Sequence, residues 1–355
     1  MIETLASSGK QEEAESQERE QDLLAWVAEL SREFDQSISD LPRSSSHPDL
    51  DRYLYAPYKK YVGNGGKRMR PVLCELGCMA VGGTAEVAQN AALSIESFHQ
   101  AALIRDDIED GAVIRHGKPC IHVLEGDEIA FNASDYALSL VGQLVLFDEL
   151  LDGRTKIRIL KEISNSAART VEGQALDIGW SRDGRRDIGI DDYIEMAESK
   201  TAWYSGACPL AVGAIAGGGT ESEISGLREF GRMFGLAFQI HDDLLDITCD
   251  EGETGKKRGM DIAAGKLTYM TVYALRRSEP SAAGELNEIL SAKSADDADI
   301  ERGIEIVRDS GAVQSARERI SLLVKDAKKI LLDTVGPSRA RDALQALANR
   351  LVDLR

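Results

Sequence analysis

Asp-Asp-Ile-Glu-Asp at residues 106–110 and Asp-Asp-Leu-Leu-Asp at residues 242–246 are two acidic clusters set in apolar, helix-forming sequence. A helix places residues four apart on one face, so the first and third aspartates of each cluster are expected side by side. Unpaired like charges at this spacing weaken a helix by about a few tenths of a kcal/mol. Two such clusters with apolar flanks therefore indicate that a cation binds between the carboxylates.

Magnesium is the cation that this pattern favours. Mg²⁺ takes oxygen ligands and is typically held by one or two carboxylates together with substrate phosphates. Two facing clusters can hold several such ions around one diphosphate. For either cluster taken alone, a solvated acidic helix face remains the alternative.

The composition predicts an all-α fold. The chain has 355 residues, of which 43% are apolar and only 5% aromatic, and it is rich in helix-forming residues without a run of alternating strands. A net charge of −18 argues against nucleic-acid binding through a broad basic face. The five cysteines form no CxxC pair, which is typical of reduced thiols in a cytoplasmic protein.

The domain organisation is expected to be simple. Residues 1–20 are acidic, carry no signal peptide and are expected to be disordered or loosely helical, whereas residues 21–355 are expected to form one helical domain. The charge-free stretch 201–220 contains Pro209 and five glycines, which favours a buried core helix over a transmembrane segment. Helices are predicted at about residues 21–37, 71–81, 85–110, 128–150, 155–174, 190–217 and 222–248, followed by three or four more.

Basic residues lie where a diphosphate bound to these metals would need them. One group follows a glycine turn, a second follows the first acidic cluster, and a third follows the second acidic cluster. Each group alone would usually be a solvated run of charge, but the repeated placement favours a single site for metal and diphosphate. The groups are Lys67, Arg68 and Arg70; Arg115 and Lys118; and Lys256, Lys257, Arg258 and Lys266.

On these residues the chain resembles the trans-isoprenyl diphosphate synthases, the polyprenyl synthetase family, and within it the geranylgeranyl diphosphate synthases. The resemblance covers about residues 60–270, and its motifs occur in the family's order. They are Gly-Gly-Lys-Arg-Met-Arg-Pro (65–71), the first acidic cluster, Arg-His-Gly-Lys-Pro (115–119), Gly-Gln-Ala-Leu-Asp (173–177), Lys200-Thr201, Phe238-Gln239 with the second acidic cluster, and Gly255-Lys256 with Gly265-Lys266.

The resemblance implies a fold and a reaction. The fold would be a single large helical bundle of the isoprenoid synthase type around a central cavity, assembled as a homodimer. The enzyme would join isopentenyl diphosphate head-to-tail to dimethylallyl, geranyl or farnesyl diphosphate. Mg²⁺, three ions per site, would assist ionisation of the allylic diphosphate, and the released diphosphate would accept the proton.

The resemblance also assigns roles to residues. The expected direct metal ligands are Asp106, Asp110 and Asp242, with Asp107, Asp243 and Asp246 as further ligands or supporting groups. The expected catalytic set adds Lys200, Thr201 and Gln239 to the direct ligands. The expected substrate-binding residues are Arg115, Lys200 and Lys256 for the allylic diphosphate, Lys67, Arg70, His99 and His116 for isopentenyl diphosphate, and Gln174, Thr201, Gln239 and Lys266 around them, with Asp177 near the metals.

Two features distinguish this chain within the family pattern. His116 replaces the usual arginine after Arg115, which would weaken the grip on isopentenyl diphosphate. Small residues, Ala101 and Ala102, precede the first acidic cluster, and Phe98 lies one turn deeper, so the product is expected to be geranylgeranyl diphosphate or longer. The alternatives are a non-catalytic subunit of a heteromeric prenyl synthase and a class I terpene cyclase.

Overall fold

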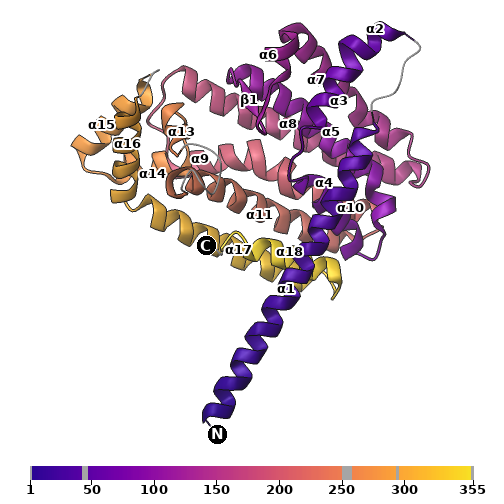
Figure 1. Ribbon diagram of the computed structural model, residues 1–355. Helices are drawn as coiled ribbons and strands as arrows, with labels where there is room; N and C mark the ends of the chain where they lie inside the picture. Colours follow the sequence, from indigo (N-terminus) through magenta and orange to yellow (C-terminus); the bar gives the residue numbers. More distant parts are fainter. Residues whose placement is uncertain (1, 42–46, 250–257, 293–295, 353–355) are drawn as a thin grey trace. The chain divides into compact units, whose positions relative to one another are not determined.

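The protein is almost entirely helical in the computed structural model, which describes residues 2–41, 47–249, 258–292 and 296–352 (Figure 1). The predicted all-α fold is thereby confirmed; within the described residues the only strands form one two-stranded hairpin. The elements are α1 (Ile2–Ser39), α2 (Pro48–Leu50), η1 (Asp51–Tyr55), α3 (Ala56–Val62), α4 (Met69–Ala80), α5 (Ala85–Glu109), β1 (Ile114–Arg115), β2 (Lys118–Pro119), α6 (Ile121–Glu125), α7 (Asp127–Leu146), α8 (Gly153–Arg182), α9 (Ile190–Ala197), η2 (Glu198–Ala207), α10 (Cys208–Ala216), α11 (Glu221–Thr248), α13 (Met260–Ala263), α14 (Tyr269–Arg277), α15 (Pro280–Ser291), α16 (Asp297–Asp309), α17 (Ala312–Thr334) and α18 (Arg339–Asn349).

The chain divides into two compact units. Unit 1 comprises Met1–Ile163, Pro209–Ser225 and Val335–Leu347, and unit 2 comprises Ser164–Cys208, Gly226–Thr334 and Ala348–Arg355. The expectation of one domain over residues 21–355 stays a prediction. The first acidic cluster belongs to unit 1 and the second to unit 2.

Helix α1 is longer than the sequence pattern suggested. We expected a helix only from about residue 21, after a disordered or loosely helical segment, but α1 begins at Ile2. Residues 1–20 are rich in Glu, Gln and Ala, which are good helix formers, and this explains why the helix continues through them. Further along α1, the residues at helical spacing Val27, Leu30, Phe34 and Ile38 are buried.

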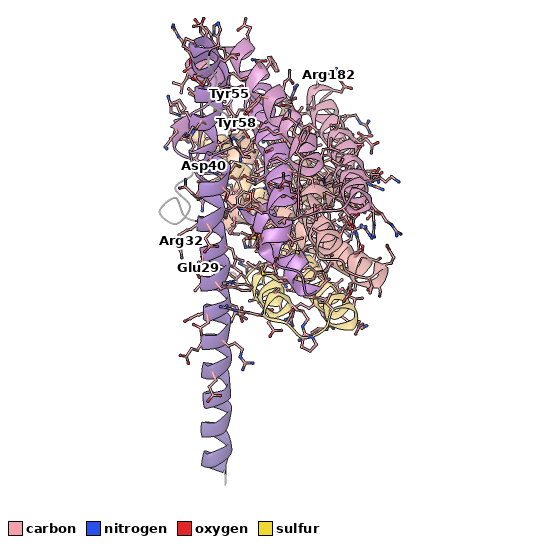
Figure 2. The ribbon with its side chains drawn as sticks, turned by 90° about the vertical axis from the view of Figure 1, so that its right-hand side faces the viewer. Glu29, Arg32, Asp40, Tyr55, Tyr58 and Arg182 are labelled. Carbon is pink, nitrogen blue, oxygen red and sulfur yellow. The ribbon has the colours of Figure 1, made fainter. Side chains whose placement is uncertain are left out.

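The opposite face of α1 is polar. Figure 2 shows Glu29 and Arg32 along this helix and Asp40 just after its end, and all three are exposed. The half-buried Trp26 ring of α1 lies 4.3 Å from the guanidinium carbon of Arg339 on α18, also in unit 1. The amphipathic pattern thus determines which side of α1 packs against the rest of unit 1.

Helix α5 is the central helix of unit 1 and packs against both α4 and α7 (Figure 1). Because it is covered on more than one side, small apolar residues such as Ala88, Ala91 and Ala92 are buried around it. Its partner α7 is the one helix among the described residues that is long and apolar enough to cross a membrane. It packs extensively on α5, yet only 33% of its most apolar stretch is buried, and Phe131, Leu138 and Leu146 are exposed.

Glycines allow α4 and α10 to approach each other closely within unit 1. A methyl group on Gly213 would lie 1.9 Å from the carbonyl oxygen of Cys74, and one on Gly77 would lie 2.6 Å from that of Leu210. Both positions therefore exclude any larger side chain. The prediction of a buried helix in the charge-free stretch 201–220 is confirmed, although α10 itself begins only at Cys208.

In unit 2 the π-helical segment η2 packs closely on both α8 and α11. A methyl group on Gly173 of α8 would lie 2.2 Å from the backbone nitrogen of Lys200, and one on Gly231 of α11 would lie 2.3 Å from the carbonyl oxygen of Gly206. The predicted helix 190–217 is thus three consecutive segments, α9, η2 and α10. A π-helical turn often marks a functional site, and η2 carries Lys200 and Thr201.

A buried carboxyl group on α4 generates a prediction about stability and pH. Burial, and then the charge of Glu33 on α1, raise the pKa of Glu75 from 4.5 to about 7. Between these values the folded chain holds a proton that the unfolded chain releases, so the free energy of unfolding falls as the pH rises through this window. Glu75→Gln should therefore be more stable than the wild type at pH 8, by about 1–3 kcal/mol, and gain little near pH 4.5.

Urea denaturation at the two pH values measures this effect. The control is Glu29→Gln, which alters an exposed charge on the same helix as Glu33 and leaves both Glu33 and Glu75 in place. An equal gain of Glu75→Gln at both pH values would contradict the assignment, because an effect of packing alone does not depend on pH.

Candidate active site

The first acidic cluster lies at the C-terminal end of α5, in unit 1. Asp106 is half-buried and Asp110 is exposed, whereas Asp107 is only 1% exposed. This follows from helical geometry, because residues four apart share a face and the intervening residue points elsewhere. The structure therefore separates two accessible carboxylates from one that is enclosed by protein.

Asp107 is surrounded by hydrogen-bond donors. The Tyr61 hydroxyl donates to its Oδ2 at 2.8 Å, and the Arg115 Nε donates to its Oδ1. Burial, and then the Asp107 charge, raise the pKa of the Tyr61 phenol, and burial, followed by a hydrogen bond to Asp107, raises the pKa of Cys120 to about 11. Both groups therefore remain protonated at neutral pH and can donate.

Arg115 connects the first cluster to the β1–β2 hairpin. Its Nη2 also lies 3.1 Å from Oδ2 of Asp106, so one guanidinium serves two adjacent carboxylates. The hairpin loop consists of His116 and Gly117, both with positive φ (50° and 73°), as a type I′ turn requires. His116, the predicted departure from the family pattern, is exposed at this turn.

The glycine turn before α4 is followed by three cations that lie in different surroundings. Arg68 has φ 45° and is buried, and its guanidinium donates to Asp35 at 2.7 Å, to Glu96 at 2.8 Å and to the carbonyl of Val62 at 2.6 Å. It thereby joins α1, α3 and α5. Sequence reasoning grouped Arg68 with its neighbours as a ligand-facing cation, but the structure makes it an internal anchor, a role for which the sequence gives no signal.

The two neighbouring cations remain candidates for binding an anion. Lys67 is exposed, and its carbonyl oxygen accepts a hydrogen bond from Ser31 at 3.1 Å. The Arg70 Nη1 lies 3.0 Å from Nε2 of His99. Burial, and then the charges of Arg70 and Arg115, lower the pKa of His99 well below its ordinary value, so His99 is neutral at pH 7 and accepts this hydrogen bond.

The predicted chain-length residues lie on α5 before the first acidic cluster. Ala101 is buried, and its carbonyl oxygen accepts a hydrogen bond from Ser134 of α7 at 3.1 Å. Ala102 and Phe98 are half-buried. The Arg105 Nε donates to the same Ser134 hydroxyl at 3.0 Å. Two hydrogen bonds through Ser134 therefore link α5 to α7.

The second acidic cluster lies near the C-terminal end of α11, in unit 2, and repeats the burial pattern of the first. Asp242 is exposed, Asp246 is half-buried and Asp243 is 4% exposed. Asp243 accepts hydrogen bonds from the Tyr193 hydroxyl at 2.6 Å, the Tyr269 backbone nitrogen at 2.9 Å and Nε2 of Gln239 at 2.9 Å. Burial raises the pKa of Asp243 to about 7, and the donated hydrogen bonds act in the opposite direction.

Asp246 stabilises the start of α13. Its two carboxylate oxygens accept from the backbone nitrogens of Met260, at 3.0 Å, and Asp261, at 3.2 Å. Its carbonyl oxygen accepts from Gly259 at 2.9 Å. Asp246 therefore fixes the point at which the chain returns to α13, whereas Lys256, predicted to bind diphosphate, lies outside the described residues.

The remaining predicted residues of unit 2 lie on α8, on η2 and before α14. Lys200 forms an ion pair with Asp177 of α8, and both side chains are about one quarter exposed. Thr201 is buried, whereas Gln174 and Lys266 are half-buried. The close approach at Gly173 explains how Lys200 reaches this carboxylate.

The chemistry of these donors fits magnesium. In the part of the chain that the structure describes, no three His, Cys, Asp or Glu side chains form a ready-made metal site. Mg²⁺, however, usually binds one or two carboxylates and completes its octahedron with water and phosphate oxygens. Asp106 with Asp110 in unit 1, and Asp242 in unit 2, offer accessible carboxylates of this kind.

Comparison with known proteins gives a consistent result. The family model described as polyprenyl synthetase matches residues 51–307. A short chain isoprenyl diphosphate synthase of Methanothermobacter thermautotrophicus is 36% identical over 327 residues, which cover 92% of this chain and 98% of that protein.

Solved structures show the same likeness. Geranylgeranyl pyrophosphate synthetase from Pyrococcus horikoshii Ot3 has a TM-score of 0.86 at 30% identity, over 94% of this chain and 99% of that one. Geranylgeranyl pyrophosphate synthase from Corynebacterium glutamicum, complexed with isoprenyl diphosphate and magnesium, has a TM-score of 0.83 at 29% identity, over 93% and 99% of the two chains.

The anchoring role of Arg68 generates a prediction about stability. Arg68→Met would leave the carboxylate of Glu96, whose side chain is 2% exposed, buried without its cation. Loss of one partner of a buried pair costs about 3–5 kcal/mol. The matched control is Lys67→Met, which removes the adjacent but exposed cation and should change stability by no more than about 0.5 kcal/mol. Equal urea midpoints for the two variants would refute the anchoring role.

Proposed function

This chain belongs to the polyprenyl synthetase family, and we therefore propose that it condenses isopentenyl diphosphate head-to-tail with dimethylallyl, geranyl or farnesyl diphosphate. The product is a longer trans-prenyl diphosphate. The observation that carries this proposal is that the family match includes both acidic clusters and the basic motifs beside them. A non-catalytic subunit, as the rival, would be expected to have lost one of the two clusters.

Mg²⁺ is the proposed cofactor, with three ions per site. When bound, it neutralises charge on the allylic diphosphate and so assists departure of that group. The family resemblance makes Asp106, Asp110 and Asp242 the proposed direct ligands, and none of these three side chains is buried. The magnesium complex of the Corynebacterium glutamicum relative supports the choice of metal.

Cationic side chains hold the two diphosphates. Arg115, Lys200 and Lys256 grip the allylic diphosphate, and Arg115 and Lys200 each form an ion pair with a carboxylate. These ion pairs keep each cation in place without the entropy cost of ordering it on binding. Lys266 is proposed as a supporting cation for the same diphosphate.

Lys67, Arg70, His99 and His116 bind isopentenyl diphosphate in the same proposal. His99 is neutral, so its contribution is to orient Arg70 rather than to add charge. His116 is exposed at the turn between β1 and β2. Gln174, Thr201 and Gln239 line the reacting centre. Because these side chains are uncharged, the diphosphate stabilises the allylic cation, and the double bond of isopentenyl diphosphate attacks it.

Assembly as a homodimer and a cytoplasmic location complete the proposal. The homodimer is carried over from the family, whereas the cytoplasmic location rests on the cysteines, which form no CxxC pair. A class I terpene cyclase is disfavoured because its second metal motif is built on Asn, Ser and Glu, whereas residues 242–246 repeat the aspartate pattern.

Turnover by the purified chain alone tests the function. With Mg²⁺, labelled isopentenyl diphosphate and farnesyl diphosphate, the wild type should yield a longer prenyl diphosphate, and Asp106→Asn or Asp242→Asn should lower kcat about 10³-fold, corresponding to ~4 kcal/mol of transition-state stabilisation. Glu109→Gln, an exposed carboxylate outside the ligand set, is the matched control and should retain activity. Activity only after addition of a second chain would instead favour the heteromeric subunit, and hydrocarbon formed without isopentenyl diphosphate would favour the cyclase.

The product is proposed to be geranylgeranyl diphosphate, with its length limited by Phe98. The small Ala101 and Ala102 leave room along α5, and Phe98 lies one turn deeper. Phe98→Ala should therefore lengthen the product by at least one isoprene unit, as measured by chromatography of the dephosphorylated alcohols. An unchanged product distribution, with activity retained, would show that another residue limits the chain.

A further inference from the structure

Each acidic cluster has its second aspartate bonded to a buried tyrosine from a distant part of the sequence. Tyr61 of α3 precedes Asp107 by 46 residues and donates to it at 2.8 Å. Tyr193 of α9 precedes Asp243 by 50 residues and donates to it at 2.6 Å. The flanking sequences of the two tyrosines differ, yet the same contact occurs in each unit independently.

The surroundings of these aspartates leave little room for a hydrated cation. Both oxygens of Asp107 are engaged, one by Tyr61 and one by Arg115, and both oxygens of Asp243 accept bonds from its three donors. Mg²⁺ sheds its water reluctantly and demands ligands at about 2.0–2.1 Å in an octahedron. A metal ion at either oxygen would have to displace a protein donor from a site that is nearly closed to water.

The contacts instead fix the rotation of each helix end. Asp107 and Asp243 lie one position after the first aspartate of each cluster, so they point about 100° away from it around the helix axis. A carboxylate held on the inner side therefore sets the direction in which the first and third aspartates project. Burial, and then the neighbouring carboxylates, raise the pKa of both phenols, so each remains a donor at neutral pH.

We propose that Tyr61 and Tyr193 are positioning residues for the two metal-binding clusters, and that Asp107 and Asp243 are their anchors rather than metal ligands. This inference rests on the proposed function, since it concerns the same site. The first anchor also orients Arg115, and the second also orients Gln239 and the start of α14 at Tyr269.

The test uses Tyr61→Phe and Tyr193→Phe, which keep the ring and remove only the donor. Titration calorimetry of Mg²⁺ into the full chain, with inorganic diphosphate present, should show an affinity lower by roughly 10-fold to 100-fold, the usual effect of removing a group that orients a metal ligand. In the condensation assay, the Mg²⁺ concentration for half-maximal rate should rise by the same factor, while kcat at saturating Mg²⁺ changes less.

Two matched controls separate positioning from a general loss of stability. Tyr58→Phe removes a buried phenol from the same helix as Tyr61, and Tyr269→Phe removes a hydroxyl that contacts Ser315 at 2.9 Å while keeping the backbone donor to Asp243. Both should bind Mg²⁺ like the wild type. Equal weakening in the controls, or wild-type affinity in Tyr61→Phe and Tyr193→Phe, would overturn the positioning role.

Asp107→Asn tests the second half of the proposal, because asparagine keeps an oxygen for Tyr61 without the charge that a ligand would supply. The variant should bind the same number of Mg²⁺ ions as the wild type, with lower affinity. A stoichiometry reduced by one ion would identify Asp107 as a ligand and overturn the assignment. A wild-type chain that binds Mg²⁺ and diphosphate but transfers no prenyl group would refute the proposed function and leave the positioning inference standing.

Discussion

A buried carboxylate and the donors around it are the interaction on which each acidic cluster depends. Asp107 and Asp243 are placed inside the protein by the same helical turn that exposes their neighbours. An unpaired buried charge is costly, so each requires several donors from other elements. Those donors connect α3 and the β1–β2 hairpin to α5 in unit 1, and α9 and α14 to α11 in unit 2.

Close backbone packing brings the remaining polar groups into position. Gly173 lets η2 approach α8 closely enough for Lys200 to pair with Asp177, and Gly213 lets α10 approach α4. Arg68 plays the corresponding role for the glycine turn, because its ion pairs connect α1 and α5 beside Lys67 and Arg70. Lys67 and Arg70, which are proposed to bind substrate, thus lie beside an arginine whose own partners are internal.

The sequence predicted those features that depend on local periodicity. The helix expected at residues 85–110 is α5 (Ala85–Glu109) and that expected at 222–248 is α11 (Glu221–Thr248), since apolar spacing and end signals are local. It missed the roles of Tyr61 and Tyr193, whose partners lie about fifty residues away, and of Arg68, whose burial depends on α1 and α5. The expectation that Asp246 lies near the metals stays a prediction, whereas its hydrogen bonds to the start of α13 are a tertiary contact without a local pattern.

The proposed function requires that Asp106, Asp110 and Asp242 all bind magnesium when the allylic diphosphate is present. Counting Mn²⁺ ions by electron paramagnetic resonance, with a non-ionisable allylic thiolodiphosphate bound to the full chain, tests it most directly. Three ions are expected in the wild type, and tight binding of all three should be lost when either Asp106 or Asp242 is replaced by asparagine. Two sets of ions that are lost separately, each with its own cluster, would contradict it.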